Sequence, residues 1–172
     1  MKQCSSVAIA DRPSVNSYAP WLVQPLALQE EWGENGRRGA ESLQQAHHDS
    51  LRILVVTDSM RSAARLKKTL FALGFSETLV AYSGKRALAA VLGYSPAVAI
   101  VDLELSDMTG YSLARSLRTH TARQVRRIPL IAVAERSEFA TGELARAAGF
   151  LGLLSKPVPS WLLNGLLLRS LK

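Results

Sequence analysis

The sequence predicts an α/β fold: a doubly wound, five-stranded parallel sheet with helices on both faces, preceded by an irregular N-terminal extension. Stretches typical of strands and of helices alternate five times from Leu51 onward. The strand-like stretches are short, continuous apolar runs, as expected of strands that are buried on both faces. The helix-like stretches place apolar residues three or four positions apart. Five such units in succession imply parallel strands joined by right-handed crossovers.

The first strand and the first helix have well-marked ends. We expect a strand over 52–57, because it contains the apolar run Ile53-Leu54-Val55-Val56. The hydroxyl of Ser59 can then cap a helix over 60–73, and Gly74 can end it. The apolar residues of this helix that share one face are Ala63, Leu66, Leu70 and Leu73.

The later elements repeat this pattern. We expect strands over 78–82, 97–102, 128–134 and 151–155. We expect helices over 84–93, 110–119, 138–148 and 159–171. In the helix over 84–93, the residues expected to point inward are Leu88, Val91 and Leu92. Pro129 fits near the start of its strand because a missing backbone donor is tolerated there.

Residues 1–50 show no sustained apolar period, and prolines and glycines interrupt them repeatedly. We therefore expect a largely disordered extension over 1–50, followed by one domain over 51–172. The alternative is a docking segment, since tryptophan is a frequent anchor in protein interfaces. Its anchors would be Trp21, Leu22, Leu26 and Trp32. The adjacent His47, His48 and Asp49 lack the spacing of a metal site, and we assign them no role.

Composition limits the class of protein. Hydrophobic residues make up 48% of the chain, which is enough to build a core. The single cysteine, Cys4, excludes an internal disulfide and fits a reducing compartment. No apolar run approaches the roughly 20 residues of a membrane-spanning helix. We therefore expect a cytoplasmic protein without a membrane partner.

Charge is distributed unevenly along the chain, whose formal net charge is +7. Residues 1–50 hold four basic and six acidic side chains, whereas the remainder holds 17 basic and eight acidic ones. The basic residues form two clusters: Arg61, Arg65, Lys67 and Lys68, and Arg115, Arg118, His120, Arg123, Arg126 and Arg127. Such clusters are either solvated surface or contacts for an anionic ligand, such as nucleic acid or a nucleotide. Because no aromatic residues are interleaved for base stacking, the solvated surface is favoured.

Three charged residues lie at predicted strand ends. Asp58 follows the first strand, Asp102 ends the third, and Lys156 follows the fifth. The carboxyl ends of parallel strands meet at one edge of a sheet, where such folds hold their ligands. Two carboxylates and an amine at that edge suit a phosphoryl group and a divalent cation. The simpler alternative is a salt bridge between Asp102 and Lys156 without further chemistry.

These motifs resemble the receiver domain of two-component response regulators. The run that ends at Asp58 resembles the family's first strand, which normally closes with two adjacent acids. Ile100-Val101-Asp102 resembles the phospho-accepting strand, and Ser155-Lys156-Pro157 resembles the invariant lysine with its following, usually cis, proline. Leu105-Ser106-Asp107-Met108-Thr109-Gly110 stands where the family usually has Met-Pro-x-Met-Asp-Gly. The resemblance covers residues 51–172.

The resemblance implies roles for these residues. Asp102 would accept the phosphoryl group from a histidine kinase or a phosphotransfer protein, and Lys156 would bind a phosphoryl oxygen. Asp58, Asp102 and the backbone carbonyl of Glu104 would hold Mg²⁺. The chain would then be no independent enzyme; at most it would catalyse its own phosphorylation and dephosphorylation.

Four positions depart from the family's pattern. Thr57 replaces the first of the paired acids, which should weaken Mg²⁺ binding. Ala134 replaces the Ser or Thr whose hydroxyl binds the phosphoryl group, and Leu153 replaces the aromatic residue of the usual switch. Ser106 replaces the usual proline. Two functions therefore remain open: a phosphoaccepting receiver with a different switch, or a degenerate receiver that acts as a phosphorylation-independent adaptor.

Output would occur through contact with an unidentified protein, because the last predicted helix ends the chain and no effector domain follows. The output face of the resembled family would here comprise Glu138, Leu144, Arg146, Trp161 and Leu168. Trp161 is an anchor if it is exposed, although a tryptophan at the start of an apolar helix more often lies in the core. We therefore expect Trp161 in the core.

Overall fold

The computed structural model describes residues 51–135 and 142–171. The extension expected over 1–50, its docking alternative and its histidines lie outside the described residues, as does Glu138. Among the helices in the described ranges, none is long and apolar enough to cross a membrane.

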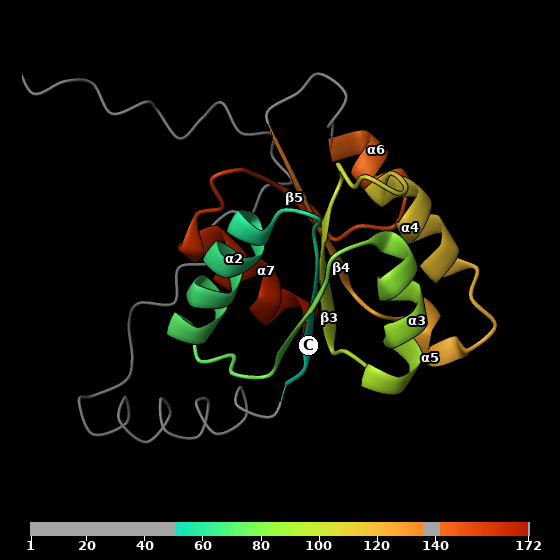
Figure 1. Cartoon of the computed structure of the whole chain (residues 1–172), viewed down its shortest axis with the longest axis horizontal. Coiled ribbons are helices and arrows are strands. Elements are labelled where there is room, and N and C mark those ends of the chain that lie inside the picture. Colours follow the sequence, from blue (N-terminus) through green and yellow to red (C-terminus); the bar gives the residue numbers. More distant parts are fainter. Residues whose placement is uncertain (1–50, 136–141, 172) are drawn as a thin grey trace, which may run out of the picture.

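A single parallel sheet forms the centre of the fold (Figure 1). Its strands are β1 (Ile53–Val56), β2 (Thr78–Ala81), β3 (Val98–Asp102), β4 (Leu130–Ala134) and β5 (Gly152–Ser155). They lie in the order β2-β1-β3-β4-β5, and every neighbouring pair is parallel. The chain therefore starts near the middle of the sheet, winds to one edge and then to the other. This confirms the predicted doubly wound, five-stranded parallel fold.

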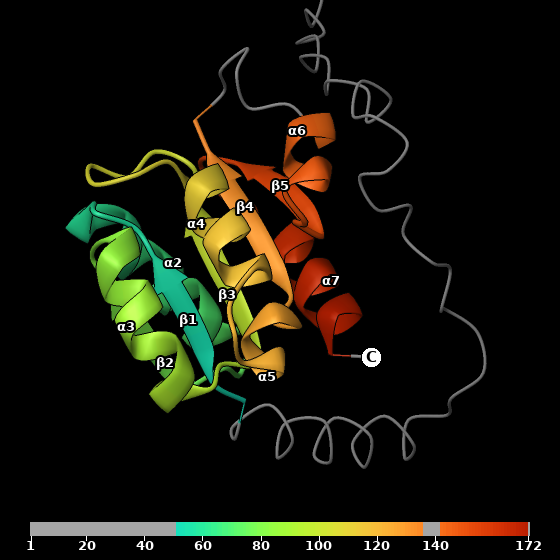
Figure 2. The ribbon, with the colours of Figure 1, turned by 90° about the vertical axis from the view of Figure 1, so that its right-hand side faces the viewer.

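Helices cover both faces of this sheet. On one face lie α2 (Met60–Ala72) and α7 (Ser160–Ser170). On the other lie α3 (Gly84–Tyr94), α4 (Gly110–Arg118), α5 (Arg123–Arg126) and α6 (Gly142–Ala147). Figure 1 shows the two layers on opposite sides of the strands, and Figure 2 shows the second layer from the front.

The core consists of two apolar layers, one on each side of the sheet. Successive side chains of a strand point to opposite faces. Ile53 and Val55 therefore pack in the cluster that contains Leu70 of α2, whereas Leu54 and Val56 pack in the cluster formed with α3 and α4. Burial on both faces explains why these strands are continuous apolar runs in the sequence.

Three details differ from the prediction. Helix α5 was not expected, because its four residues, Arg123–Arg126, have no apolar period and only Val125 is buried. Leu92 is exposed, since the buried face of α3 follows Gly84, Ala87 and Val91. Trp161 is 65% exposed, so its assignment to the core is wrong. The buried face of α7 is formed instead by Leu163, Leu166 and Leu167.

Candidate functional site

Asp102 is the last residue of β3, the central strand of the sheet. Strands β1 and β4 flank β3, so the ends of three strands surround the Asp102 side chain. The carboxylate is almost completely buried, with 3% of its side chain exposed. A buried charge is costly unless it is paired and hydrogen-bonded, so its partners decide what this position can do.

Three donors contact the Asp102 carboxylate. The Lys156 ammonium donates to Oδ2 over 2.7 Å, and the Thr57 hydroxyl donates to the same oxygen over 3.0 Å. The backbone N–H of Glu104 donates to Oδ1 over 3.2 Å. Oδ2 thus carries a charge-assisted bond and a neutral bond, whereas Oδ1 has one longer bond. The two carboxylate oxygens are therefore chemically unequal.

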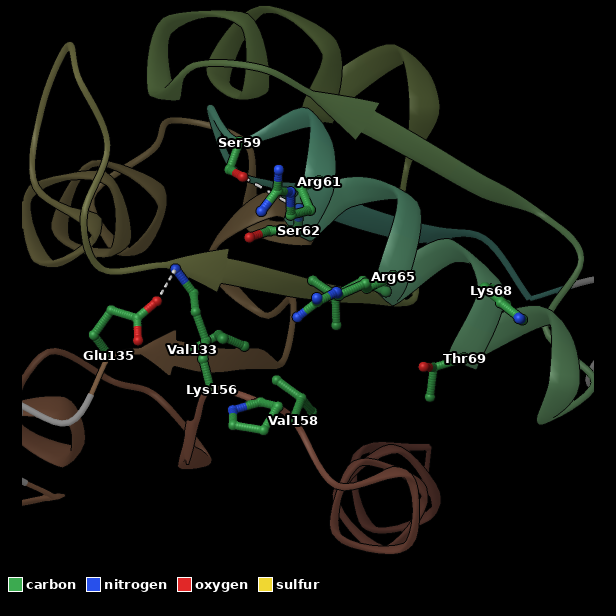
Figure 3. Close-up of a pocket in the computed structure, with 12 residues that line it drawn as sticks. Ser59, Arg61, Ser62, Arg65, Lys68, Thr69, Val133, Glu135, Lys156 and Val158 are labelled. Atoms are coloured by element: carbon green, nitrogen blue, oxygen red, sulfur yellow. Dashed lines mark hydrogen bonds and ion pairs between the residues drawn. The ribbon is translucent and has the colours of Figure 1, made fainter.

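Lys156 reaches Asp102 from the end of β5, two strands away from β3. Its backbone N–H donates to the carbonyl of Ala134 over 2.8 Å, and the following peptide bond to Pro157 is cis. The ammonium also lies 3.8 Å from a carboxylate oxygen of Glu135, the contact dashed in Figure 3. Because Glu135 is 61% exposed, that second ion pair contributes little compared with the bond to Asp102.

Thr57 is buried at the end of β1 and adds a donor at a position where the sequence indicated only a missing acid. Its hydroxyl accepts from the N–H of Ser59 over 3.3 Å while it donates to Asp102. A second carboxylate here would repel Asp102 and attract a cation. Threonine instead stabilises the single Asp102 charge. The sequence signal for this contact was Thr57 itself, a β-branched hydroxyl residue that follows β1 at the level of Asp102 on the adjacent strand β3.

Asp58 follows Thr57 in the chain and differs from Asp102 in its exposure and in its partners. It is exposed, and within residues 51–135 and 142–171 no side chain or N–H bonds to its carboxylate. The structure therefore brings Asp102, Lys156 and Thr57 into contact, whereas Asp58, at the same edge of the sheet, has no partner in the described part of the chain.

A family model described as the response regulator receiver domain matches residues 53–165, well over half of the chain. The chain belongs to this family. The CheY-like receiver domain of Methylobacillus flagellatus is 28% identical, with a TM-score of 0.62, 72% coverage of this chain and 100% of that one. Chemotaxis response regulator CheY4 of Vibrio cholerae is 26% identical, with a TM-score of 0.61, 70% coverage of this chain and 98% of that one.

A further similar structure is the signal receiver domain of a signal transduction histidine kinase from Syntrophus aciditrophicus. It is 27% identical, with a TM-score of 0.63, and the match covers 71% of this chain and 90% of that domain. No curated protein sequence matches the chain. These structures show what the receiver is similar to, and its own residues decide its chemistry.

The oxygen atoms around this receiver's site fit Mg²⁺ in kind. Mg²⁺ prefers hard oxygen ligands, and the available ones are the Asp58 and Asp102 carboxylates and the carbonyl of Glu104. The hydrogen bond that closes the following loop joins Gly110 N to the carbonyl of Leu103 over 2.9 Å, so it does not use the Glu104 carbonyl. Among the residues that the structure describes, no group of three acidic, histidine or cysteine side chains could hold a metal. The candidate Mg²⁺ ligands therefore include two carboxylates where the family's pattern has three.

The loop after Asp102 is fastened to α3, a contact that the sequence did not reveal. The carboxylate of Asp107 accepts from the N–H groups of Gly84 and Lys85, each over 2.9 Å. These backbone hydrogen bonds hold the pKa of Asp107 below its ordinary value. Met108 lies so close to Gly84 that a Cβ atom there would be 2.5 Å from its sulfur. The lack of an acid in the first turn of α3 is no signal for this clamp, because α2, α4 and α7 lack one as well.

The two positions of the family's usual switch are aliphatic in this receiver. Ala134 ends β4, is buried, and has no hydroxyl to offer a phosphoryl oxygen. Leu153 of β5 is partly buried and packs against the same core cluster that contains Ala134. The usual coupling between a hydroxyl and an aromatic side chain therefore has no chemical basis here.

Part of the second basic cluster is structural. Arg118 donates to the carbonyls of Arg126, Ile128 and Gly149, each over 2.8 Å. Burial lowers the pKa of the Arg118 guanidinium. Arg126 donates in turn to the carbonyls of His120 and Thr121, over 2.7 and 2.9 Å. Arg118 and Arg126 thus hold the α4–β4 connection together, and part of their hydrogen-bonding capacity is already used.

The proposed output face has exposed apolar side chains. They are Leu144 of α6 together with Trp161 and Leu168 of α7. Trp161 fits an interface anchor better than a core residue because most of its surface is accessible.

Proposed function

We propose that this chain is a stand-alone, cytoplasmic receiver that accepts a phosphoryl group on Asp102 and signals through protein–protein contacts. A histidine kinase or a phosphotransfer protein would supply the group. The observation that carries this proposal is the buried Asp102 carboxylate at the end of β3, 2.7 Å from the Lys156 ammonium. An aspartate nucleophile beside a cation that can follow the transferred charge is the minimum that phosphoryl transfer to a carboxylate needs.

The geometry favours Oδ1 of Asp102 as the attacking atom. Oδ2 holds both Lys156 and Thr57, whereas Oδ1 accepts one bond of 3.2 Å. Attack forms a bond from Oδ1 to phosphorus and breaks the bond from phosphorus to the donor's nitrogen or oxygen, which leaves with its electron pair. Lys156 then pairs with a phosphoryl oxygen. Asp58, Asp102 and the carbonyl of Glu104 would hold Mg²⁺, which would supply positive charge to neutralise the phosphoryl oxygens.

Signalling in this proposal uses a packing change other than the family's usual one. Ala134 and Leu153 cannot form the hydroxyl–aromatic coupling. The group that must move is Lys156, since its partner changes from Asp102 to the phosphoryl group. Lys156 is bonded through its backbone to Ala134 and leads into α7, which carries Trp161. We therefore propose that the α7 surface transmits the output.

A second candidate function is an adaptor that binds its partner without phosphorylation. The Thr57 hydroxyl favours it, because Lys156 and Thr57 together satisfy Oδ2 before any ligand arrives. Neither function makes the chain an independent enzyme, and at most it promotes its own phosphorylation and dephosphorylation.

Mass spectrometry of the purified protein after incubation with acetyl phosphate and Mg²⁺ distinguishes the two functions. The phosphoacceptor predicts one added phosphoryl group, absent from Asp102→Asn. Asp107→Asn is the matched control, because it also removes one carboxylate from the same edge and should still be modified. If no adduct forms over a wide range of Mg²⁺ concentrations, the adaptor is correct.

A further inference from the structure

A cavity of about 580 Å³ lies between α2 and the connection from β5 to α7 (Figure 3). Its volume falls in the range of small-molecule pockets, roughly 300–1,000 Å³. Helix α2 contributes three cations, Arg61, Arg65 and Lys68, and Lys156 lines the pocket from the end of β5. The hydroxyls of Ser62 and Thr69 line it as well. The cavity therefore combines several positive charges with neutral donors.

The α2 cations lack partners among the residues that the structure describes. In the part of the chain that the structure describes, Arg61, Arg65 and Lys68 form no ion pair or hydrogen bond through their side chains. Helix α2 has no acidic residue that could neutralise them. Within residues 51–135 and 142–171, Glu135 is the one acid that lines the cavity, and its nearest cation is Lys156, 3.8 Å away.

The spacing of these cations is unfavourable for the helix on its own. Arg61 and Arg65 are four residues apart, and Arg65 and Lys68 are three apart, so all three share one face and repel one another. Arg61 also lies in the first turn, where the helix dipole favours a negative charge. Helix α3, on the opposite face of the sheet, shows the favourable arrangement, because the Asp107 carboxylate binds its first N–H groups. A bound anion would supply to α2 the negative charge that Asp107 supplies to the first turn of α3.

We propose that this cavity binds a small polyanion that carries a diphosphate or triphosphate group. Guanidinium groups bind phosphate oxygens through two parallel hydrogen bonds, and Arg61 and Arg65 place two such groups one helical turn apart. Lys68 extends the row by a further turn. Three cations in line match a chain of phosphates better than a single phosphate ion. This proposal does not depend on phosphoryl transfer to Asp102, although the two sites share Lys156.

The shape and the lining residues distinguish a small ligand from a macromolecule. The cations line a concave cavity. Docking of an acidic protein or a duplex would instead require a flat strip of cations. Among the described residues no aromatic side chain lines the cavity, so base stacking on them would contribute nothing to binding. The phosphate chain is therefore the recognised group, whether it comes from inorganic pyrophosphate or from a nucleotide.

Isothermal titration calorimetry of the full chain tests this proposal, with pyrophosphate, ADP and sulfate as probes in buffer without Mg²⁺. We expect saturable binding of one pyrophosphate, at least about tenfold tighter than sulfate, because a diphosphate engages two guanidinium groups. Equal affinities for pyrophosphate and ADP indicate that the diphosphate alone is recognised. A higher affinity for ADP indicates that the nucleoside adds contacts.

Matched variants locate the site. The double variant Arg61→Gln, Arg65→Gln should weaken pyrophosphate binding by at least about tenfold, whereas Lys67→Gln should change it less than about twofold. Lys67 is the control because it belongs to the same helix but does not line the cavity. Arg65→Lys keeps the charge and should recover part of the affinity, which guards against a folding defect in the glutamine variants.

Two results would overturn the proposal: no saturable binding of pyrophosphate at low ionic strength, or equal losses in Lys67→Gln and in the arginine variants. A further contradicting result combines two observations: pyrophosphate does not bind, and the arginine variants lose phosphotransfer from a protein donor. The cavity would then serve protein docking. Asp102→Asn separates this site from the proposed phosphoacceptor. It abolishes phosphorylation but should leave pyrophosphate affinity unchanged or higher, because it frees Lys156.

Discussion

Two neighbouring groups of polar side chains, one at the carboxyl edge of the sheet and one on helix α2, are in opposite states. In the Asp102 group, the carboxylate, the Lys156 ammonium and the Thr57 hydroxyl are buried or partly buried and bonded to one another. In the α2 group, Arg61, Arg65 and Lys68 line a cavity without a partner in the described ranges. The first group stabilises the free protein. The α2 group stabilises the protein only when an anion is bound. In the ligand-free protein, substitutions in the two groups should therefore have opposite effects on the free energy of unfolding.

The largest expected effect is that of removing Lys156. Lys156→Met should lower the free energy of unfolding by about 3 kcal/mol, because it leaves the Asp102 charge buried without its cation. Asp102→Asn should cost less than about 1 kcal/mol, since asparagine still accepts a hydrogen bond and the lysine can turn to solvent. Urea unfolding at neutral pH measures both. Equal costs for the two variants would show that the pair is not electrostatically coupled.

A second, smaller effect concerns Thr57 and Mg²⁺. Thr57→Asp should raise Mg²⁺ affinity by about tenfold, equivalent to about 1.4 kcal/mol, because it adds a third carboxylate beside Asp58 and Asp102. Calorimetric titration with MgCl₂ measures the change. Thr57→Asn introduces a side chain of the same shape as aspartate but without the charge, and it should not raise Mg²⁺ affinity. An unchanged affinity in Thr57→Asp would place the metal elsewhere or exclude it.

The Asp107 clamp predicts a dependence of stability on pH. The pKa of Asp107 lies below its ordinary value of 3.8, so the native state favours the ionised carboxylate. Its contribution is therefore present above pH 3.8 and is lost as the pH falls through the lowered pKa. The stability difference between wild type and Asp107→Asn should narrow as the pH falls from 6 to 3. A difference that does not vary with pH would contradict the role of charge in this clamp.

The smallest effect is the most specific to the α2 group. Arg61→Gln should stabilise the ligand-free protein by about 0.5 kcal/mol, because it removes both the repulsion from Arg65 and a cation from the first turn of α2. Lys67→Gln should have almost no effect, since Lys67 has no charged residue three or four positions away on the helix. Added salt should reduce the gain in Arg61→Gln. Destabilisation by Arg61→Gln would mean that Arg61 has a structural partner.

The sequence was informative about the Asp102 group because strand ends can be located from apolar runs. Asp102 and Lys156 each end a run that is buried on both faces, and parallel strands carry their ends to one edge. The same reasoning predicted all five strands and their helices to within a few residues. The contact of Thr57 with Asp102 was missed because sequence spacing shows which residues end adjacent strands but not which side-chain atoms meet.

Features that depend on surface or loop geometry could not be predicted. The Asp107 clamp joins two segments 22 residues or more apart without an apolar pattern. Helix α5 is one turn in which two of the four residues are basic. Trp161 is exposed because the helical phase of α7 is set by three leucines further along. The basic residues of α2 were grouped with Lys67, but only the fold shows which of them share the cavity wall.

The most direct test of Asp102 as the phosphoacceptor locates the phosphoryl group within the chain. After incubation with acetyl phosphate and Mg²⁺, borohydride reduction converts an aspartyl phosphate to homoserine, which peptide mass spectrometry can assign to a residue. We predict homoserine at position 102 and nowhere else in the chain. Modification of Asp58 in place of Asp102, or no modified aspartate at any Mg²⁺ concentration, would contradict the assignment of Asp102 as the phosphoacceptor.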